Sequence, residues 1–257
     1  MIDLEPAGPN RFTLAVKPPV CVGPPDHQFL FGGAGLAAAV AALEAVTGRP
    51  TVWAAAQYLS YARPPATLDL DVVVPVSGRH SSQARVTGHV GDTEILTVNA
   101  ALGSRPEPLV AQWATMPSVP HPADCPELTQ DWARSKTDIR GRLDLRVASP
   151  RDQAPDGRSM LWARRVDGGV VDRVTLAVFA DFLPSGISPA LGQRAGGNSL
   201  DNTIRYVRTV PTEWVLLDTQ IDAVASGFGH GRMQLYADDG TLMASASQSL
   251  IVRLPKG

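Results

Sequence analysis

The chain has 257 residues, of which 44% are hydrophobic and 19% are charged, and its formal net charge is −2 at pH 7. This length allows one large domain or two of ordinary size, and the balance of apolar and charged residues is that of a globular protein. A nearly neutral chain has no overall basic field, so we expect no nucleic-acid partner. The five histidines are scattered, without His-x-x-x-His or Cys-x-x-Cys spacing, so we expect no metal site.

Two cysteines, Cys21 and Cys125, are too few for a disulfide framework, which favours a reduced, cytoplasmic protein. Residues 1–12 lack a basic region followed by an apolar core, so they are not typical of a signal peptide. The most apolar run, residues 29–43, is rich in Gly and Ala and is too short to cross a membrane. We therefore expect no membrane span.

The first predicted element of note is a helix over residues 33–46. Leu36, Val40 and Leu43 recur at the i, i+4, i+7 spacing of one helix face, and the alanines between them allow close approach on other sides. Gly48 is typical of the residue that ends a helix. A helix this apolar is expected to be surrounded by other structure.

A series of strand-like runs follows this helix. Leu68, Leu70 and Val72 alternate with polar residues, as in a strand with one buried face. Glycines at turn positions within residues 76–82 and 90–94 predict that consecutive strands form antiparallel hairpins. The predicted strands occupy residues 51–62, 66–76, 81–90 and 93–102.

The pattern changes at Gly103 and is later repeated. Residues 103–126 hold six prolines without a sustained period, which indicates a connecting segment on the surface. A short helix over 127–136, a second apolar helix over 172–183 and another series of strands follow. The two series can be superposed in sequence at an offset of about 147 residues, which indicates duplicated units.

A buried helix packed against an antiparallel sheet, present twice, predicts an α+β protein. We place the N-terminal unit at 1–104, a proline-rich linker at 105–135 and the C-terminal unit at 136–257.

Six motifs make the chain similar to the acyl-CoA thioesterase II family, whose fold is a tandem, or double, hotdog. They are FGGAGLAAAVAA, YARPP, TMPSVPHP, NSLDNTIRYVR, EWVLLD and ASASQSLIVR, in the family's order and spacing from about residue 20 to 253. The resemblance implies hydrolysis of acyl-CoA to a free acid and coenzyme A, a role in fatty acid metabolism, and a homo-oligomer. It implies no bound cofactor, because coenzyme A enters as part of the substrate.

The duplication itself singles out two polar residues. Sliding the second half onto the first places Asp201 on or near Ala56, and Gln248 near Ala101. An acid and an amide in one copy, against alanines in the other, indicate a single surviving site, although Asp201 alone is also typical of a turn or cap. Asp201 would act as general base and Gln248 would hold the attacking water. The resemblance implies that an acid and an amide at these positions are catalytic.

Two glycines are candidates for oxyanion stabilisation. Gly32 and Gly33 begin the first helix, where backbone N–H groups lack intrahelical acceptors, and they leave room for a thioester carbonyl. Close helix–sheet packing explains the same glycines equally well.

One position departs from the family pattern. Where the family carries a Thr or Ser hydroxyl, this sequence aligns Ala223, which cannot bond to water or substrate. Ser226 or Asp222 would substitute, a second water would fill the gap, or activity would be weak. Ala223 therefore supports an alternative function, a non-catalytic acyl or acyl-CoA binding protein.

Other residues carry weaker hypotheses. Asp26 and His27 would suit a hotdog hydratase, although His27 is more typical of a surface or capping residue. Arg164 and Arg165 would meet coenzyme A phosphates or simply form a solvated face. The tryptophans at 53, 162 and 214 are expected to be core aromatics.

Overall fold

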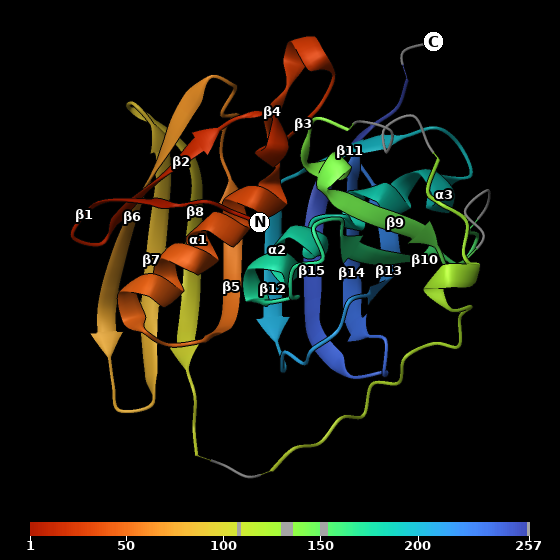
Figure 1. Ribbon diagram of the computed structural model, residues 1–257. Helices are drawn as coiled ribbons and strands as arrows, with labels where there is room; N and C mark the ends of the chain where they lie inside the picture. The colour runs from red at the N-terminus through yellow and green to blue at the C-terminus, as the bar shows by residue number, and fades with distance from the viewer. Residues whose placement is uncertain (107–108, 130–135, 150–153, 256–257) are drawn as a thin grey trace.

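The computed structural model describes residues 1–106, 109–129, 136–149 and 154–255. Within these ranges, an antiparallel sheet of thirteen strands runs through both halves of the chain (Figure 1). The strand order is β1-β2-β6-β7-β8-β5 in the first half and β12-β15-β14-β13-β10-β9 in the second, with β11 also beside β15. The first-half strands are β1 (Glu5–Gly8), β2 (Arg11–Val16), β5 (Thr51–Tyr58), β6 (Ala66–Ser77), β7 (Ser81–Val90) and β8 (Thr93–Gly103).

The second half repeats the hairpin arrangement of the first. Its strands are β9 (Leu143–Val147), β10 (Arg158–Arg165), β11 (Gly196–Ser199), β12 (Asp201–Tyr206), β13 (Val215–Ala225), β14 (Phe228–Ala237) and β15 (Leu242–Arg253). The halves join where β5 pairs with β12 in antiparallel register, Ala56 opposite Asn202. The predicted hairpins of the first half are confirmed, because β6 pairs with β7 and β7 with β8.

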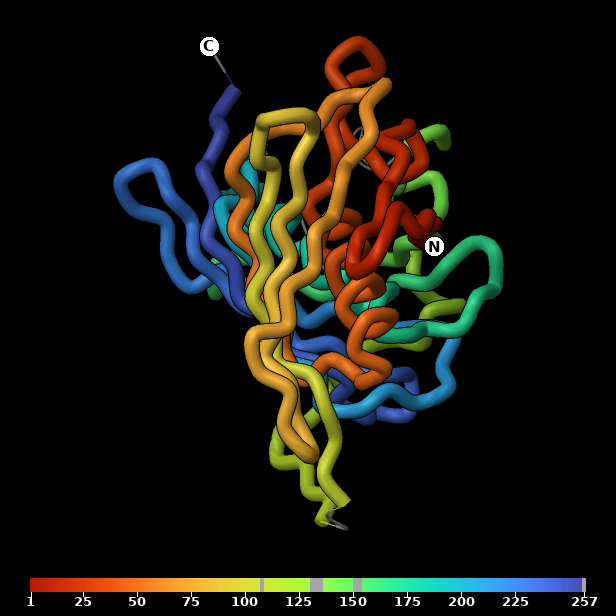
Figure 2. Tube along the Cα trace, turned by 90° about the vertical axis from the view of Figure 1, so that its left-hand side faces the viewer, coloured from red at the N-terminus to blue at the C-terminus, as the bar shows by residue number. Residues whose placement is uncertain are grey.

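The helix α1 (Gly32–Thr47) lies against the first-half strands, and Figure 2 shows it on one side of the β6–β7–β8 hairpins. Ten of its residues are buried, as expected for a helix that is surrounded by other parts of the protein. Gly48 ends it in the left-handed conformation at φ 64° and donates its N–H to the Glu44 carbonyl. A residue with a side chain adopts that conformation at a cost, which explains the glycine.

The second half lacks a continuous counterpart of α1. The helix predicted over 172–183 is α2 (Arg173–Ala180), and it continues as a 3-10 turn at Leu183–Gly186 and a one-turn helix α3 (Ile187–Leu191). The expectation of one long helix in each half is therefore wrong for this half. Pro184 lacks the N–H that would bond to the Ala180 carbonyl, and its ring would clash with that carbonyl, so α2 does not continue as an α-helix past Ala180.

The helical run Arg173–Leu191 is long and apolar enough to cross a membrane by length and composition alone, but 67% of its most apolar 18 residues is buried within the protein. A helical segment that is mostly buried within the protein is typical of a core helix.

The segment after β8 crosses beneath the second half, the long yellow-green path at the bottom of Figure 1. Gln112 fixes it to the turn between β14 and β15, donating to the Gly240 carbonyl and accepting from Leu242 N–H. The connecting path predicted for residues 103–126 is thus tied to the second half. Most of the helix predicted over 127–136 lies outside the described residues. Short 3-10 turns occupy Pro18–Val20, Pro25–His27, Pro122–Asp124 and Ile139–Arg142, and a two-stranded sheet pairs β3 (Cys21–Val22) with β4 (Phe29–Leu30).

Cys21 and Cys125 are both buried and free. Trp162 is a core residue as expected, and its indole N–H donates to the Pro120 carbonyl. Trp214 packs under Arg164, whose guanidinium lies 4.6 Å from the ring centroid. Trp53 is only partly buried.

The start of α1 touches the end of α2 at Gly33. A Cβ added to Gly33 would lie 2.7 Å from Phe31 Cε1 and 2.8 Å from both Asp181 Cβ and the Val178 carbonyl oxygen. The contact with backbone cannot relax by a change of rotamer. The glycine therefore permits the two helices to meet.

Gly33→Ala is expected to lower the free energy of unfolding by about 1–3 kcal/mol, because overpacking forces these helices apart. Urea unfolding followed by circular dichroism measures the change. Gly196→Ala is the control, because a Cβ there meets no atom within 4 Å. Equal stabilities of the two variants would contradict the prediction.

Candidate active site

Asp181 is the carboxylate at the centre of the candidate site. It caps the C-terminus of α2 and is buried, with 4% of its surface exposed. Its Oδ2 accepts the Gly33 N–H at 2.6 Å, so a residue of the second half caps the first turn of α1. Phe31, which precedes that helix, provides no side-chain cap. Asp181 therefore links the two halves at the helix start.

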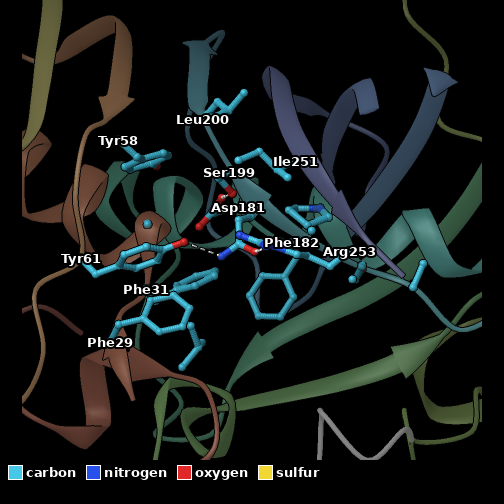
Figure 3. A pocket seen from close by; sticks show the side chains of 18 of the residues that line it. Phe29, Phe31, Tyr58, Tyr61, Asp181, Phe182, Ser199, Leu200, Ile251 and Arg253 are labelled. Carbon is cyan, nitrogen blue, oxygen red and sulfur yellow. Dashed lines mark hydrogen bonds between the residues drawn. The ribbon is translucent and has the colours of Figure 1, made fainter. Parts of the chain in front are cut away.

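Gln248 and Ser199 contact the other oxygen of this carboxylate. Asp181 Oδ1 accepts Gln248 Nε2 at 2.5 Å and Ser199 Oγ at 2.9 Å. Gln248 Nε2 also donates to Ser199 Oγ at 2.7 Å. Figure 3 shows Ser199 and Asp181 next to each other at the inner side of a pocket. We call Asp181, Ser199, Gln248 and their neighbours Tyr58 and Asn202 the polar cluster.

A bulge between β11 and β12 sends Ser199 and Asn202 to the same face of the sheet. Ser199 lies opposite Leu250 of β15, whereas Thr203 lies opposite Ser247, so the β11–β12 side carries one extra residue. Without it, residues of odd and even number would point to opposite faces. The bulge thus builds the polar cluster from two short strands.

Burial raises the pKa of Asp181 to about 6, against hydrogen bonds from Gln248, Ser199 and Gly33 that each lower it. Asn202 lies beside the carboxylate and also lowers its pKa, although neither of its amide atoms meets hydrogen-bond geometry. Desolvation is the dominant effect. The carboxyl therefore titrates close to neutral pH.

Several buried polar atoms of the cluster have no hydrogen-bond partner among the described residues. They are Tyr58 Oη, Gln248 Oε1 and both amide atoms of Asn202. Burial raises the pKa of Tyr58 well above its ordinary value, and the negative charges of Asp181 and Asp201 act in the same direction, which keeps the phenol protonated. Buried polar atoms are normally paired, so these atoms indicate a place for water or a polar ligand.

The pocket beside the cluster has a volume of about 1370 Å³. Asp181 is the only carboxylate among the described residues that line it, and no described histidine lines it. Aromatic rings form edge-to-face pairs in its wall, Phe29 with Tyr61 at 5.0 Å and Phe31 with Phe182 at 5.6 Å (Figure 3). The volume is more than that of an ordinary small-molecule site.

Two exposed cationic side chains also belong to the pocket lining. Arg194 and Arg253 are both exposed there. Arg253 Nε donates to Asn198 Oδ1, and Asn198 Nδ2 donates to Tyr61 Oη, the dashed line in Figure 3. The pocket thus combines a buried carboxylate, an aromatic wall and an accessible positive charge.

Comparisons with known proteins agree with this geometry. A model of the acyl-CoA thioesterase C-terminal domain matches residues 120–252. The chain is similar to the structure of a protein from Novosphingobium aromaticivorans, provisionally named a thioesterase. The two are 38% identical, the match covers 99% of this chain and 98% of that one, and the TM-score is 0.90. This chain belongs to the acyl-CoA thioesterase family. It is a thioester hydrolase, and the family predicted from the motifs is confirmed.

More distant structures support the fold of this thioesterase. A hotdog-fold protein of unknown function from Alicyclobacillus acidocaldarius is 20% identical, covers 99% of this chain and 97% of its own, and has a TM-score of 0.86. An acyl-CoA thioesterase II, TesB2, from Mycobacterium marinum is 19% identical, covers 100% and 96%, and has a TM-score of 0.78. Comparison with curated proteins finds no match.

Asp201 of the thioesterase does not line the pocket. It begins β12, on which Asn202, Ile204 and Tyr206 face the core, so Asp201 points toward the opposite face. Its Oδ1 accepts the backbone N–H of Ser249 at 2.8 Å. The Asp201 carboxylate thus contacts the backbone of the neighbouring strand β15, which is neither the predicted catalytic contact nor a turn or helix cap.

The predicted correspondence, Asp201 on or near Ala56 and Gln248 near Ala101, brings together residues of opposite faces of the sheet. Ala56 faces the core whereas Asp201 does not, and Gln248 lies on the core face, as Ala100 does in the first half, whereas Ala101 is buried on the opposite face. A slip of one residue moves a side chain to the other face of a sheet. Gln248 nevertheless lies at a position where the first half has an alanine, so the predicted difference in polarity between the two halves remains.

The two glycines of the predicted oxyanion site have different environments. The Gly33 N–H is already bonded to Asp181, so Gly33 is not free to bind an oxyanion. The Gly32 N–H has no hydrogen bond to another described residue, and Gly32 lines the pocket. Gly32 alone keeps the predicted role.

The residues predicted around the missing hydroxyl lie apart from the cluster. Ala223, Asp222 and Ser226 are exposed, and none lines the pocket. Asp222 pairs with Arg232 Nη1 at 2.5 Å, and Ser226 forms the turn after β13 at φ 52°. The structure does not bring them to Gln248.

The remaining candidates also lie elsewhere. Asp26 and His27 are exposed residues of a 3-10 turn and do not line the pocket. Arg164 pairs with Asp144, and Arg165 pairs with Asp167. Within the described ranges, no group of three or more His, Cys, Asp or Glu side chains is placed to hold a metal ion.

Sequence reasoning missed Asp181, Ser199, Tyr58 and Asn202. One signal was present, because Asp181 is an acidic residue within the apolar run 174–183. An ionised carboxylate in such a run needs partners or a shifted pKa. The identity of those partners required the fold.

Proposed function

We propose that this protein is a double hotdog enzyme that hydrolyses acyl-CoA thioesters, with the thioester carbonyl at the polar cluster. The observation that carries the proposal is the buried Asp181–Gln248–Ser199 arrangement beside a large, partly aromatic pocket. Thioester hydrolysis needs a positioned water, a base and a donor for the oxyanion. Residues of the cluster are of the right chemical type for each requirement.

The Gly32 N–H is the proposed oxyanion donor. It lies at the first turn of α1, where the helix dipole favours negative charge, and Gly32 has no side chain to obstruct a carbonyl. Gln248 would hold the attacking water through Oε1, which has no hydrogen-bond partner in the part of the chain that the structure describes. Because the amide stays neutral at all working pH values, it orients water without taking its proton.

The acyl group would occupy the apolar wall near Phe31 and Phe182. The pocket meets α1 at Gly32 and Gly35. The coenzyme A phosphates would lie toward Arg194 and Arg253, since guanidinium groups bind phosphate with charge-assisted hydrogen bonds. No bound cofactor takes part, because coenzyme A belongs to the substrate.

Purified protein is expected to release free thiol from at least one member of a panel of saturated and aromatic acyl-CoA substrates. A thiol-trapping chromophore measures the release, and calorimetry with the same compounds measures binding. Binding without thiol release would support an acyl-CoA binding protein instead. Consumption of an enoyl-CoA without thiol release would support the hydratase.

A further inference from the structure

We propose that the Tyr58 phenol is a second oxyanion donor, which binds the thioester carbonyl together with the Gly32 N–H. This inference rests on the proposed hydrolysis and adds a side chain to the place where negative charge develops. Seven described residues have a buried side-chain nitrogen or oxygen without a hydrogen-bond partner, and Tyr58 alone among them lines the pocket. The Tyr58 ring therefore borders the pocket while its hydroxyl lacks an acceptor.

The sheet fixes Tyr58 where the two halves of the chain meet. Tyr58 is the last residue of β5, its N–H donates to the Leu200 carbonyl at 2.9 Å, and it lies opposite Leu96 of β8. Figure 3 shows its ring on the same part of the pocket wall as Asp181 and Ser199. A residue of the first half is thus held beside the polar side chains of the second.

The end of the ring that carries the hydroxyl packs against Gly32. A Cβ added to Gly32 would lie 2.9 Å from Tyr58 Cζ, the carbon bonded to the hydroxyl, and 3.2 Å from Cε1. The Gly32 N–H has no hydrogen bond to another described residue. Two donors without acceptors therefore lie next to each other at the start of α1. An oxyanion site consists of such donors within reach of one oxygen.

The surroundings of Tyr58 keep its hydroxyl available as a donor. Burial raises the pKa of Tyr58 well above its ordinary value, and the charges of Asp181 and Asp201 act in the same direction, so the phenol stays protonated. In the described part of the chain, no hydrogen bond joins the hydroxyl to Asp181, whose Oδ2 accepts the Gly33 N–H instead. The hydroxyl hydrogen is therefore free to bond to a substrate.

During hydrolysis the phenol would stabilise charge and keep its own proton. As the water oxygen attacks the carbonyl carbon, the π electron pair of the carbonyl moves onto its oxygen, and the Tyr58 O–H and Gly32 N–H donate to that oxyanion. The pair returns when the C–S bond breaks. The sulfur leaves with the electrons of that bond and takes up the proton that the water lost. Hydrogen bonds of catalytic groups tighten only as substrate reacts, which agrees with an unpaired hydroxyl in the free protein.

Tyr58→Phe tests this role, because phenylalanine keeps the ring and removes only the hydroxyl. For the acyl-CoA that wild type hydrolyses fastest, kcat is expected to fall by about 10²–10³-fold with little change in KM, the usual cost of removing one oxyanion donor. The urea midpoint of unfolding is expected to stay at or above that of wild type, because an unpaired buried hydroxyl contributes no hydrogen bond to the folded state. Thiol release and urea unfolding measure the two effects.

Tyr206→Phe is the matched control. Tyr206 is a buried phenol on the neighbouring strand β12, its hydroxyl donates to the Arg173 carbonyl at 2.9 Å, and it does not line the pocket. Loss of this hydrogen bond is expected to lower the urea midpoint while kcat stays at the wild-type value. The two tyrosine variants should therefore show opposite patterns of stability and activity.

Two analogues that cannot be hydrolysed separate oxyanion binding from ordinary substrate binding. A trifluoromethyl ketone in place of the thioester adds water to give a tetrahedral hydrate, whereas a thioether has no carbonyl oxygen. A group that stabilises the transition state binds the first analogue and ignores the second. Tyr58→Phe is expected to weaken binding of the ketone by the same factor as kcat/KM and to leave binding of the thioether unchanged, as measured by calorimetry.

Three results would overturn the inference about Tyr58 alone. In the first, Tyr58→Phe keeps more than about a tenth of wild-type kcat. In the second, kcat falls but the ketone binds as tightly as before, which would mean that the hydroxyl acts through another group. In the third, the ketone and the thioether lose affinity equally, which would mean a loss of pocket shape. Wild-type protein that binds acyl-CoA but releases no thiol would instead overturn the proposed function, and this result is recognised before any variant is made.

Discussion

Replacing Gln248 by leucine is expected to lower kcat by about 10²–10³-fold, the cost of removing one polar group that stabilises a transition state. Leucine fills a similar volume but provides neither the amide N–H that contacts Asp181 nor the oxygen proposed to hold water. KM should change little, because the acyl and phosphate contacts are elsewhere in the pocket. Steady-state thiol release measures both constants.

Thiol release is expected to fall at low pH as the Asp181 carboxyl becomes protonated, and the same variant should move this acid limb of the pH–rate profile to higher pH. The hydrogen bond from Gln248 stabilises the ionised form of Asp181 and lowers its pKa, so its loss raises the pKa further above about 6. Gln57→Leu is the control, because Gln57 lies exposed on β5. Wild-type kcat or an unshifted limb in Gln248→Leu would contradict the proposed contact.

Asp181→Asn is expected to make the protein more stable at neutral pH. The pKa of Asp181 rises from 3.8 to about 6 on folding, so the folded state binds the proton more tightly than the unfolded state. Stability from this group is therefore fully present below pH 4, falls between about pH 4 and 6, and is lost above pH 6. The loss amounts to about 3 kcal/mol, at 1.36 kcal/mol for each pKa unit.

Asparagine removes this penalty but also weakens the hydrogen bonds from Gln248, Ser199 and Gly33, so we expect a net gain of about 1–2 kcal/mol at pH 7.5. Urea unfolding of both proteins at pH 4 and pH 7.5 measures it. Subtracting the two proteins at each pH cancels the other titrating groups. A difference that does not grow between pH 4 and 7.5 would show that Asp181 titrates normally.

The fold was largely predictable because its signals are local. Glycines at turns and alternating Leu68, Leu70 and Val72 predict the hairpins, and Gly48 predicts the end of α1. The prediction of a long second helix was wrong because the apolar pattern that favours a helix continues beyond Ala180, where the α-helix ends ahead of Pro184. Periodicity reports which face is buried, and it does not report where a proline interrupts the backbone.

The candidate site was predictable only in part, because it depends on contacts between distant residues. Asp181 meets partners 18, 67 and 148 residues away in the chain. Gln248 was found from the comparison of the two halves, since a buried polar residue against alanine is visible in sequence. Asp201 is equally visible, but a one-residue bulge decides which face of the sheet each neighbour occupies, and a bulge leaves no clear signal in the sequence.

The hydrogen bond between Gly33 and Asp181 restricts how the two copies of the duplicated unit can diverge. The copy that carries the carboxylate depends on a backbone group of the other copy, and the first helix depends on the second copy for its cap. A substitution at Gly33 would therefore change the hydrogen bonding of Asp181, which lies 148 residues later in the chain. We therefore expect that neither copy can be deleted or exchanged without loss of an interaction that the other copy needs.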